Sequence, residues 1–223
     1  MLDERLSLAA ELYTPCELGA DIGTDHGQLP CYLLQSGKCQ RMIFADVSPK
    51  ALSRAEAEVQ RQGLQDRAIL VCADGLDALT ETCGCVSAMG MGGETLAGIL
   101  TRGQHKLKGA ALVLSAHTEL HLVRQALQDI GYRVTREVLC RAAGRFYVFW
   151  HALPGNAAAT PEEILYGSYL LRDKTPLLRE YLTWRIKVIQ AKLDGLLSAS
   201  VPDEAAIAQA QADIAFYRVK LED

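Results

Sequence analysis

The stretch Asp21-Ile22-Gly23-Thr24-Asp25-His26-Gly27 joins a short apolar run to a helical pattern. The apolar run at 17–22 is typical of a buried strand, and residues 29–36 have helical spacing, with Pro30 suited to a first helical turn. In a doubly wound α/β sheet, the turn after the first strand lies at the mouth of the ligand crevice, and glycines there let a ligand approach the backbone. The stretch therefore predicts a ligand site on an α/β fold.

The alternation of strand and helix continues through residues 1–154. Apolar runs predict further strands at 42–47, 68–73, 86–89, 110–116, 133–139 and 145–152, with helices near 2–13, 49–63, 93–101 and 118–130 between or before them. Such alternation implies βαβ units and a mostly parallel sheet. Because little separates the last two strands, we expect them to form an antiparallel hairpin at the sheet edge. The expected fold is a seven-stranded, Rossmann-like α/β domain.

The composition changes after residue 154. Residues 154–159 have the character of a linker, and Thr160-Pro161 and Thr175-Pro176 both resemble helix starts. Apolar residues then recur every three or four positions in two stretches, 178–196 and 207–221, separated by a turn containing Pro202. This pattern predicts an antiparallel, coiled-coil-like helical hairpin. We therefore expect two domains, 1–154 and 160–223.

The overall composition of the 223 residues is that of a globular protein, with 49% hydrophobic and 22% charged residues and a net charge of −4. This balance excludes global disorder and disfavours indiscriminate coating of nucleic acid. No apolar run approaches the length of a membrane span, and the acidic start lacks the apolar core of a signal peptide, so we expect a cytoplasmic protein. The seven scattered cysteines indicate reduced structural thiols and no metal site.

Acidic and glycine-rich residues follow the next predicted strands. Asp46 lies 25 positions after Asp21, where an acidic residue binds ribose hydroxyls in dinucleotide sites. Asp74 ends the third strand and is placed to accept a hydrogen bond from an adenine amino group, and Met89-Gly90-Met91-Gly92-Gly93 follows the fourth. Because the carboxyl ends of parallel strands share one sheet edge, these features together predict a nucleoside-type ligand.

The segment from Asp21 to Pro30 resembles the D-I-G-[ST]-D-H-x-x-L-P signature of TrmK, a family of bacterial tRNA (adenine-N1)-methyltransferases. Gly90-Met91-Gly92-Gly93 resembles the G-M-G-G element of that family, and the likeness extends over nearly the whole chain. The resemblance implies a class I S-adenosylmethionine-dependent methyltransferase domain followed by a coiled-coil domain. It also implies tRNA as the partner and adenine 22 as the target.

The resemblance implies a role for each matching residue. The cofactor would bind to the turn after the first strand, to the ends of the second and third strands and to the loop after the fourth. The residues expected to bind it are Asp21, Gly23, Thr24, Asp46, Val47, Asp74, Gly75, Met89, Gly90 and Met91. Asp25 and His26 are the candidate catalytic residues, and substrate binding is assigned to Pro30, Gly92, His117 and Arg145. Asp25 would stabilise the cationic product or accept from the exocyclic amine, and His26 would orient Asp25 or the base.

One loop departs from the family pattern. Leu114-Ser115-Ala116-His117 stands where a polar-Pro-polar element is expected, which leaves open whether this loop contacts the target base. Basic residues near the closing hairpin and on the helical appendage, including Arg185 and Lys187, are candidates for phosphate contacts. The chain would act as a monomer or weak dimer.

Three other interpretations remain open. The first is a methyltransferase acting on a small molecule or a protein. The second is a nicotinamide-dependent oxidoreductase, which the absence of a strict Gly-x-Gly-x-x-Gly disfavours. The third is a tRNA-binding or scaffold protein with a relic cofactor site.

Overall fold

A computed structural model describes residues 2–156, 158–167, 171, 172 and 174–222. Its strands are β1 (Cys16–Ile22), β2 (Cys39–Asp46), β3 (Ala68–Cys72), β4 (Cys85–Met91), β5 (Ala111–Ala116), β6 (Tyr132–Ala142) and β7 (Arg145–Pro154). The helices of the sheet domain are α1 (Glu4–Leu12), α2 (Gln28–Gln35), α3 (Pro49–Arg61), α4 (Gly93–Leu107), α5 (Leu120–Asp129) and α6 (Pro161–Tyr166), with 3₁₀ turns at Gln65–Arg67 and Gly75–Ala78.

The seven strands form one sheet in the order β3-β2-β1-β4-β5-β7-β6. The strands β1 to β5 are parallel to one another, and β7 runs antiparallel to both β5 and β6. The predicted seven-stranded, mostly parallel sheet is therefore confirmed. The hairpin strands are longer than predicted, because their pairing continues to a two-residue turn at Ala143 and Gly144, whose φ angles of 48° and 76° suit a tight hairpin.

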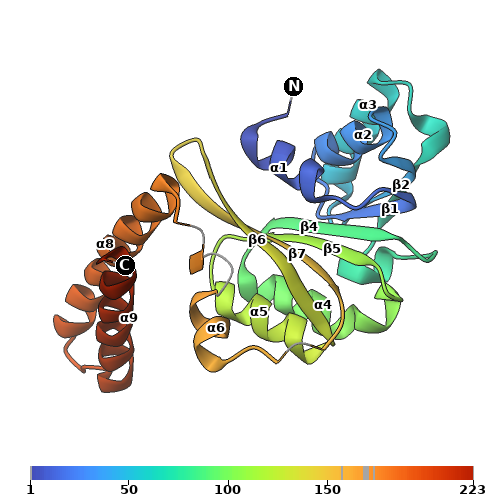
Figure 1. The fold of residues 1–223 in the computed structure, drawn as a ribbon. Helices are drawn as coiled ribbons and strands as arrows, with labels where there is room; N and C mark the ends of the chain where they lie inside the picture. Colours follow the sequence, from blue (N-terminus) through green and yellow to red (C-terminus); the bar gives the residue numbers. More distant parts are fainter. Residues whose placement is uncertain (1, 157, 168–170, 173, 223) are drawn as a thin grey trace. The chain divides into compact units, whose positions relative to one another are not determined.

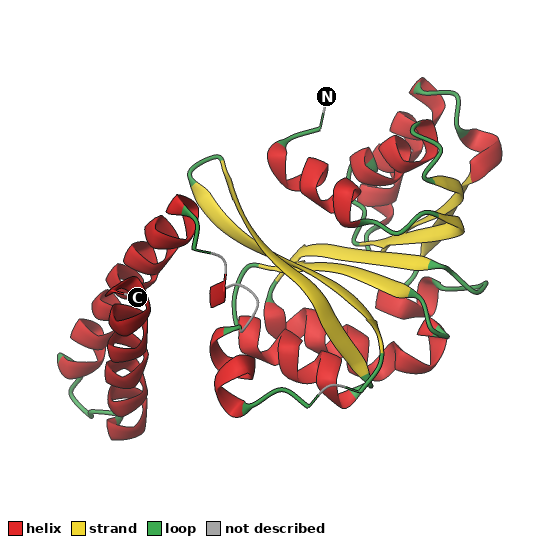
Figure 2. Ribbon diagram, viewed as in Figure 1, coloured by secondary structure: helices red, strands yellow, loops and turns green. Residues whose placement is uncertain are grey.

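Helices cover both faces of the sheet. Figure 1 shows α1, α2 and α3 on one face and α4, α5 and α6 on the other, and Figure 2 shows the same layers by secondary structure. This doubly wound arrangement leaves the carboxyl ends of β1, β2, β3 and β4 at one edge, where the loops carrying the predicted site residues emerge.

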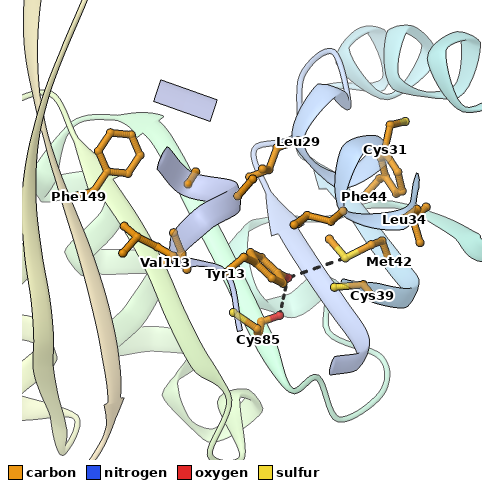
Figure 3. Packing of buried hydrophobic residues seen from close by; sticks show 14 of the residues in the cluster. Tyr13, Leu29, Cys31, Leu34, Cys39, Met42, Phe44, Cys85, Val113 and Phe149 are labelled. Atoms are coloured by element: carbon orange, nitrogen blue, oxygen red, sulfur yellow. Dashed lines mark hydrogen bonds between the residues drawn. The ribbon is translucent and has the colours of Figure 1, made fainter. Parts of the chain in front are cut away.

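Tyr13 anchors the core on the α1–α3 face (Figure 3). Its ring is 1% exposed, and its hydroxyl donates to the Cys85 carbonyl at 2.8 Å and accepts from the Ala20 N–H at 3.0 Å. A buried phenol needs such partners. Tyr13 thereby ties the segment after α1 to β1 and β4, the strands that carry the predicted cofactor loops.

The chain divides into two compact units, residues 1–169 and 170–223. The linker pattern at 154–159 predicts a boundary before α6, but α6 belongs to the first unit. The reason is a buried contact: the Arg124 guanidinium on α5 donates to the Ile164 and Leu165 carbonyls at the end of α6. The boundary therefore lies about ten residues later than the composition indicates.

The second unit contains α8 (Pro176–Leu197) and α9 (Glu204–Glu222), which pack against each other. Their buried residues fall on the predicted apolar stripes: Leu178, Leu182, Ile189, Leu193, Ala210, Ile214 and Tyr217. Tyr181 is also buried. Across the described residues of both units, no helix combines the length and apolar character that crossing a bilayer requires.

Candidate functional site

The turn after β1 is held against the end of β2. The Gly23 and Thr24 N–H groups both donate to the Ala45 carbonyl, at 2.8 and 2.9 Å, and the Gly27 N–H donates to the Thr24 carbonyl at 2.9 Å. Gly23 has a φ of 76°, a conformation that side chains disfavour. The turn is therefore a fixed backbone surface.

Asp21 is a buried carboxyl group at the base of this turn. It is 5% exposed, and its Oδ1 accepts a 2.6 Å hydrogen bond from the Ser87 hydroxyl on β4. Burial raises the pKa of Asp21 to about 6; the Ser87 hydrogen bond opposes this shift, and the Asp46 charge adds to it. Because its charge is poorly solvated, the Asp21 carboxylate would be stabilised by a cationic ligand group.

The end of β2 presents Asp46 and Val47. Asp46 is half-buried, its Oδ1 accepts from the Ser48 N–H at 2.8 Å, and its Oδ2 accepts from the Asp25 N–H at 3.3 Å. Val47, next to it, is 70% exposed. An oriented carboxylate beside an exposed apolar side chain fits a ribose next to a flat base.

The end of β3 lies beside this surface. Asp74 is exposed and pairs with Arg102 of α4, whose Nη2 lies 3.2 Å from the Asp74 carboxylate. Gly75 is buried, and a Cβ there would lie 2.8 Å from Ile99. The Asp74 carboxylate is accessible to the exocyclic amine of a ligand. That amine would compete with Arg102 for the carboxylate, because the ion pair between the two residues is exposed.

Asp25 and His26 stand at the tip of the turn. Asp25 has a φ of 44°, and its carboxylate pairs with Arg54 of α3, whose Nε lies 3.0 Å from Asp25 Oδ1. His26 Nε2 lies 3.5 Å from Asp25 Oδ2. Both side chains are more than half exposed. Arg54 and His26 thus hold an accessible carboxylate in one orientation.

A pocket of about 200 Å³ opens beside this turn. Part of its lining is the turn itself, and the rest includes residues distant in the sequence: Arg5 and Leu6 of α1, Ser115 at the end of β5, His117 after it, and Tyr147 and Phe149 of β7. The Arg5 guanidinium lies 5.1 Å from the Tyr147 ring centroid, and the His117 ring meets Tyr147 edge-on at 5.9 Å. The pocket therefore combines the polar residues of the turn with an aromatic wall of His117, Tyr147 and Phe149.

The loop after β4 is tied to the loop after β5. The His117 N–H donates to the Met91 carbonyl and the Gly93 N–H donates to the Thr118 carbonyl, both at 3.0 Å. A Cβ on Gly93 would lie 2.4 Å from the Thr118 and Glu119 carbonyl oxygens, so this close approach requires glycine. The two loops form one unit that places His117 in the pocket.

The structure brings eight of the predicted site residues into this pocket: Asp21, Gly23, Thr24, Asp25, His26, Met89, Gly90 and His117. Asp46, Val47, Asp74 and Gly75 form the neighbouring surface at the ends of β2 and β3. Met91 packs close to Gly23, and Gly92 precedes α4.

Three of the four predicted substrate residues, Pro30, Gly92 and Arg145, do not line the pocket. Pro30 is buried in the first turn of α2, where its missing N–H costs little, so its position reflects helix geometry. Arg145 is exposed at the start of β7. Because side chains alternate along a strand, Arg145 is on the same face as Tyr147 and Phe149, beyond the pocket.

Sequence reasoning missed Arg5, Arg54, Ser87, Tyr147 and Phe149. The alternation in β7 signals that Tyr147 and Phe149 share a face, but not that this face borders the site. Nothing local in the sequence indicates that Arg54 reaches Asp25, 29 positions away. These contacts follow from the strand order.

The site fits a nucleoside cofactor with a cationic end. Thr24 Oγ1 is buried beside the Asp21 carboxyl group, whose pKa it helps to lower, but it meets no partner of good hydrogen-bond geometry within the described part of the chain. Both observations are expected where a polar ligand completes the site. Among the described residues, no group of three or more His, Cys, Asp or Glu side chains gathers as a metal site.

The strand order, with an antiparallel β7 inserted between β5 and β6, and the cofactor-type loops at the carboxyl ends of the parallel strands define a class I methyltransferase fold. The profile of the methyltransferase domain family matches residues 2–150, and the chain belongs to this family.

Individual proteins resemble the chain beyond this domain. The tRNA (adenine(22)-N(1))-methyltransferase of Bacillus subtilis is 27% identical over 207 residues, covering 89% of this chain and 87% of that protein. The crystal structure of the B. subtilis m1A22 tRNA methyltransferase TrmK superposes with a TM-score of 0.88 at 22% identity, covering 99% of each chain. M. capricolum TrmK, solved with S-adenosyl-homocysteine, gives 0.85 at 23% identity, covering 100% of this chain and 98% of that one. The structural likeness establishes the fold.

Proposed function

We propose that this protein transfers a methyl group from S-adenosylmethionine to N1 of adenine 22 in tRNA. The observation that carries the proposal is the pocket that combines the cofactor-type turn with an aromatic wall. The similarity to the B. subtilis enzyme over most of both chains supports this substrate.

The cofactor would lie across the ends of β1, β2 and β3. Asp46 would bind the ribose hydroxyls, Val47 would pack against the adenine ring, and Asp74 would accept from the adenine amino group. Asp21 would face the cationic methionine end, next to the buried hydroxyl of Thr24. S-adenosylmethionine supplies an electrophilic methyl group on a positively charged sulfur.

The protein's contribution to the reaction would be alignment and charge stabilisation. The N1 lone pair of neutral adenine lies in the ring plane, so no proton needs to leave before attack, and orientation lowers the barrier. The methylated ring becomes cationic. The Asp25 carboxylate, accessible and held by Arg54 and His26, is placed to stabilise that charge or to accept from the exocyclic amine.

The aromatic wall would receive the target base. N1 lies on the Watson–Crick edge, so the base must leave its stack before it reacts. His117, which is exposed and lines the same pocket as Asp25, offers a ring surface on which an extruded adenine could stack, and the buried Tyr147 ring supports it edge-on. Arg145, on the same face beyond Tyr147, is suited to a backbone phosphate near the extruded nucleotide.

The helical hairpin would provide a second RNA-binding surface. Lys187 and Lys192 are exposed on α8 and suited to phosphate contacts. Arg185, a candidate from the sequence, lies 5.6 Å from the Tyr217 ring centroid of α9, so it packs between the two helices. Since the apolar stripes of α8 and α9 pack on each other within one chain, we also propose a monomer, acting in the cytoplasm where tRNA is found.

The test combines methyl-labelled S-adenosylmethionine with unmodified tRNA transcripts, followed by digestion to nucleosides. We expect labelled 1-methyladenosine that disappears when adenine 22 is replaced. Label at another nucleoside or position would overturn the assigned target. Cofactor binding without RNA labelling would favour another methyl acceptor, and the absence of both would favour a relic site in a tRNA-binding protein.

A further inference from the structure

The amino ends of β1 and β2 bring two cysteines together. Cys16 begins β1 and Cys39 begins β2; they are directly paired in the parallel register, and their Sγ atoms are 3.6 Å apart. Neighbouring strands are about 4.8 Å apart, within the Cα separation that a disulfide accepts. This end of the sheet is opposite the end that carries Asp21 and Asp46.

The two thiols differ in environment. Cys16 is half-buried, whereas Cys39 is fully buried. The hydrogen bond from Cys39 lowers the pKa of Cys16; burial opposes this shift, and the Cys85 and Gly84 N–H groups reinforce it. The same hydrogen bond and burial raise the pKa of Cys39. The two Sγ atoms share one hydrogen bond, and Cys16 is the thiol of the pair that an oxidant in solution can reach.

The other five cysteines lack this combination. Burial raises the pKa of Cys31, Cys83 and Cys85 to about 12 and also raises the pKa of Cys140. Cys72 is exposed, and its Sγ donates to the Val47 carbonyl at 3.6 Å. A thiol that oxidises reversibly is accessible, ionises readily and lies next to a second thiol that resolves it, and Cys16 meets all three conditions.

We propose that Cys16 and Cys39 form a site of reversible oxidation by peroxides, which closes a disulfide between β1 and β2. The Cys16 thiolate attacks one oxygen of hydrogen peroxide, the O–O bond breaks, and hydroxide leaves and takes up a proton as water. The Cys39 sulfur then attacks the Cys16 sulfenic acid, the S–O bond breaks, and the oxygen leaves with the Cys39 proton as a second water. Two thiols and one peroxide give one disulfide and two waters.

The disulfide would join the strands whose opposite ends carry the cofactor residues. It would close a loop across a separation of 23 positions that includes the Asp21–Gly27 turn and α2. Restricting the unfolded chain in this way is expected to raise the melting temperature by several degrees. Because the link lies at the far end of β1, we expect the cofactor affinity to stay within about twofold.

The test uses the full chain, reduced and then treated with equimolar hydrogen peroxide. Remaining thiols are alkylated, and the protein is digested with trypsin and Glu-C without reductant. Cleavage after Glu11, Glu17, Lys38 and Arg41 gives fragments 12–17 and 39–41, each with one cysteine. We expect these two fragments joined by a disulfide, lost on treatment with dithiothreitol. Fragment 12–17 recovered fully alkylated, or joined to a different cysteine, would overturn the proposal.

Three variants separate the roles of the two thiols. Cys16→Ser should abolish the link and leave Cys39 alkylatable only after unfolding. Cys39→Ala should let Cys16 accumulate as a sulfenic acid, trapped by dimedone, but more slowly than Cys16 reacts in the wild-type protein, because the hydrogen bond that lowers the pKa of Cys16 is lost. Cys31→Ser is the matched control, because Cys31 is buried beside the loop and should not affect the link. Equal oxidation of Cys16 and Cys31 in the wild-type protein would show that the site has no selectivity and would contradict the proposal. None of these measurements depends on methyl transfer.

Discussion

The Ser87 hydroxyl on β4 donates a 2.6 Å hydrogen bond to the buried Asp21 carboxylate on β1. The two residues are paired in the parallel register. This bond moderates the charge of Asp21 but does not cancel the cost of its burial, since the pKa of Asp21 remains raised to about 6. The site therefore holds a carboxylate whose charge is under-compensated until a cation arrives.

We expect the affinity for S-adenosylmethionine to depend on this ionisation. Binding a cationic end favours the carboxylate, so the affinity should rise with pH through about 6 and then level off. Below pH 6 the loss should approach tenfold per pH unit. Isothermal titration calorimetry from pH 5 to 8 measures the affinity for S-adenosylmethionine at each pH. Asp21→Asn should remove the dependence, and an unchanged pH profile in this variant would contradict the assignment.

The raised pKa of Asp21 also predicts how the stability of the cofactor-free protein depends on pH. Whereas the cofactor affinity should rise with pH, this stability should fall. The folded pKa of Asp21, about 6, exceeds the ordinary aspartate value of 3.8, so the stability from its bound proton is fully present below about 3.8 and is lost as the pH rises through 6. The difference corresponds to about 3 kcal/mol at neutral pH. Asp21→Asn should thus stabilise the cofactor-free protein at pH 8 and have little effect at pH 3.5. Urea unfolding at both pH values tests this, and equal effects would contradict it.

The role of Asp25 is best tested by a substitution that tolerates the positive φ angle of this residue. Alanine at a φ of 44° would add strain, whereas asparagine tolerates this conformation and removes only the charge. We expect Asp25→Asn to lower the turnover number at least tenfold with cofactor affinity within twofold. Arg54→Gln should give a smaller loss, because Arg54 acts by positioning Asp25. Wild-type turnover in Asp25→Asn would exclude the role of this carboxylate.

Gly93 and Gly98 form a matched pair on α4. A Cβ on Gly93 meets two carbonyl oxygens at 2.4 Å, whereas a Cβ on Gly98 meets only the flexible tip of Arg102 at 3.2 Å. We expect Gly93→Ala to destabilise the fold by about 2 kcal/mol or more and to displace His117 from the pocket. Gly98→Ala should be neutral or stabilising by up to about 1 kcal/mol. Similar unfolding midpoints for the two variants would contradict the close approach.

The sequence predicts the sheet well, and also which strand ends share one edge, for a physical reason. Strand periodicity, helix starts and glycine-rich turns are local, and the parallel topology brings successive strand ends to one edge, which unites Asp21, Asp46 and Asp74. The aromatic wall depends on β7 lying between β5 and β6 and on α1 covering the pocket, which are long-range contacts. For that reason Tyr147, Arg5 and Arg54 could not be found from local patterns.

The two compact units divide at a later residue than the linker pattern predicts, for a related reason. The composition of 154–159 indicates a linker, but the buried contacts of Arg124 hold α6 on the first unit. Arg124 and Glu137 are 6% and 2% exposed, their closest atoms are 2.7 Å apart, and the Trp150 indole also donates to Glu137. The helix α6 begins with a capping box of its own. It nevertheless belongs to the sheet domain, because Arg124, held in place by Glu137, donates to the carbonyl groups at its end.

Breaking this buried pair should be costly. Glu137→Gln keeps an acceptor for Trp150 but leaves the Arg124 charge uncompensated, so we expect a loss of about 3–5 kcal/mol in the free energy of unfolding. The double variant Arg124→Met/Glu137→Leu removes both charges and should be less destabilised than the single one. Chemical denaturation of both proteins gives the comparison. A double variant that is less stable than Glu137→Gln would show that the pair contributes net stability.

The proposed RNA surface of the helical hairpin can be tested with Lys187 and Arg185. Lys187 is exposed, so Lys187→Glu should raise the Michaelis constant for tRNA severalfold without changing cofactor affinity or stability. The slope of log affinity against log salt concentration should also become shallower, since one phosphate contact is lost. Arg185→Glu should instead lower the melting temperature, because Arg185 packs against Tyr217 between α8 and α9. An unchanged Michaelis constant and salt slope in Lys187→Glu would remove this part of α8 from the RNA surface.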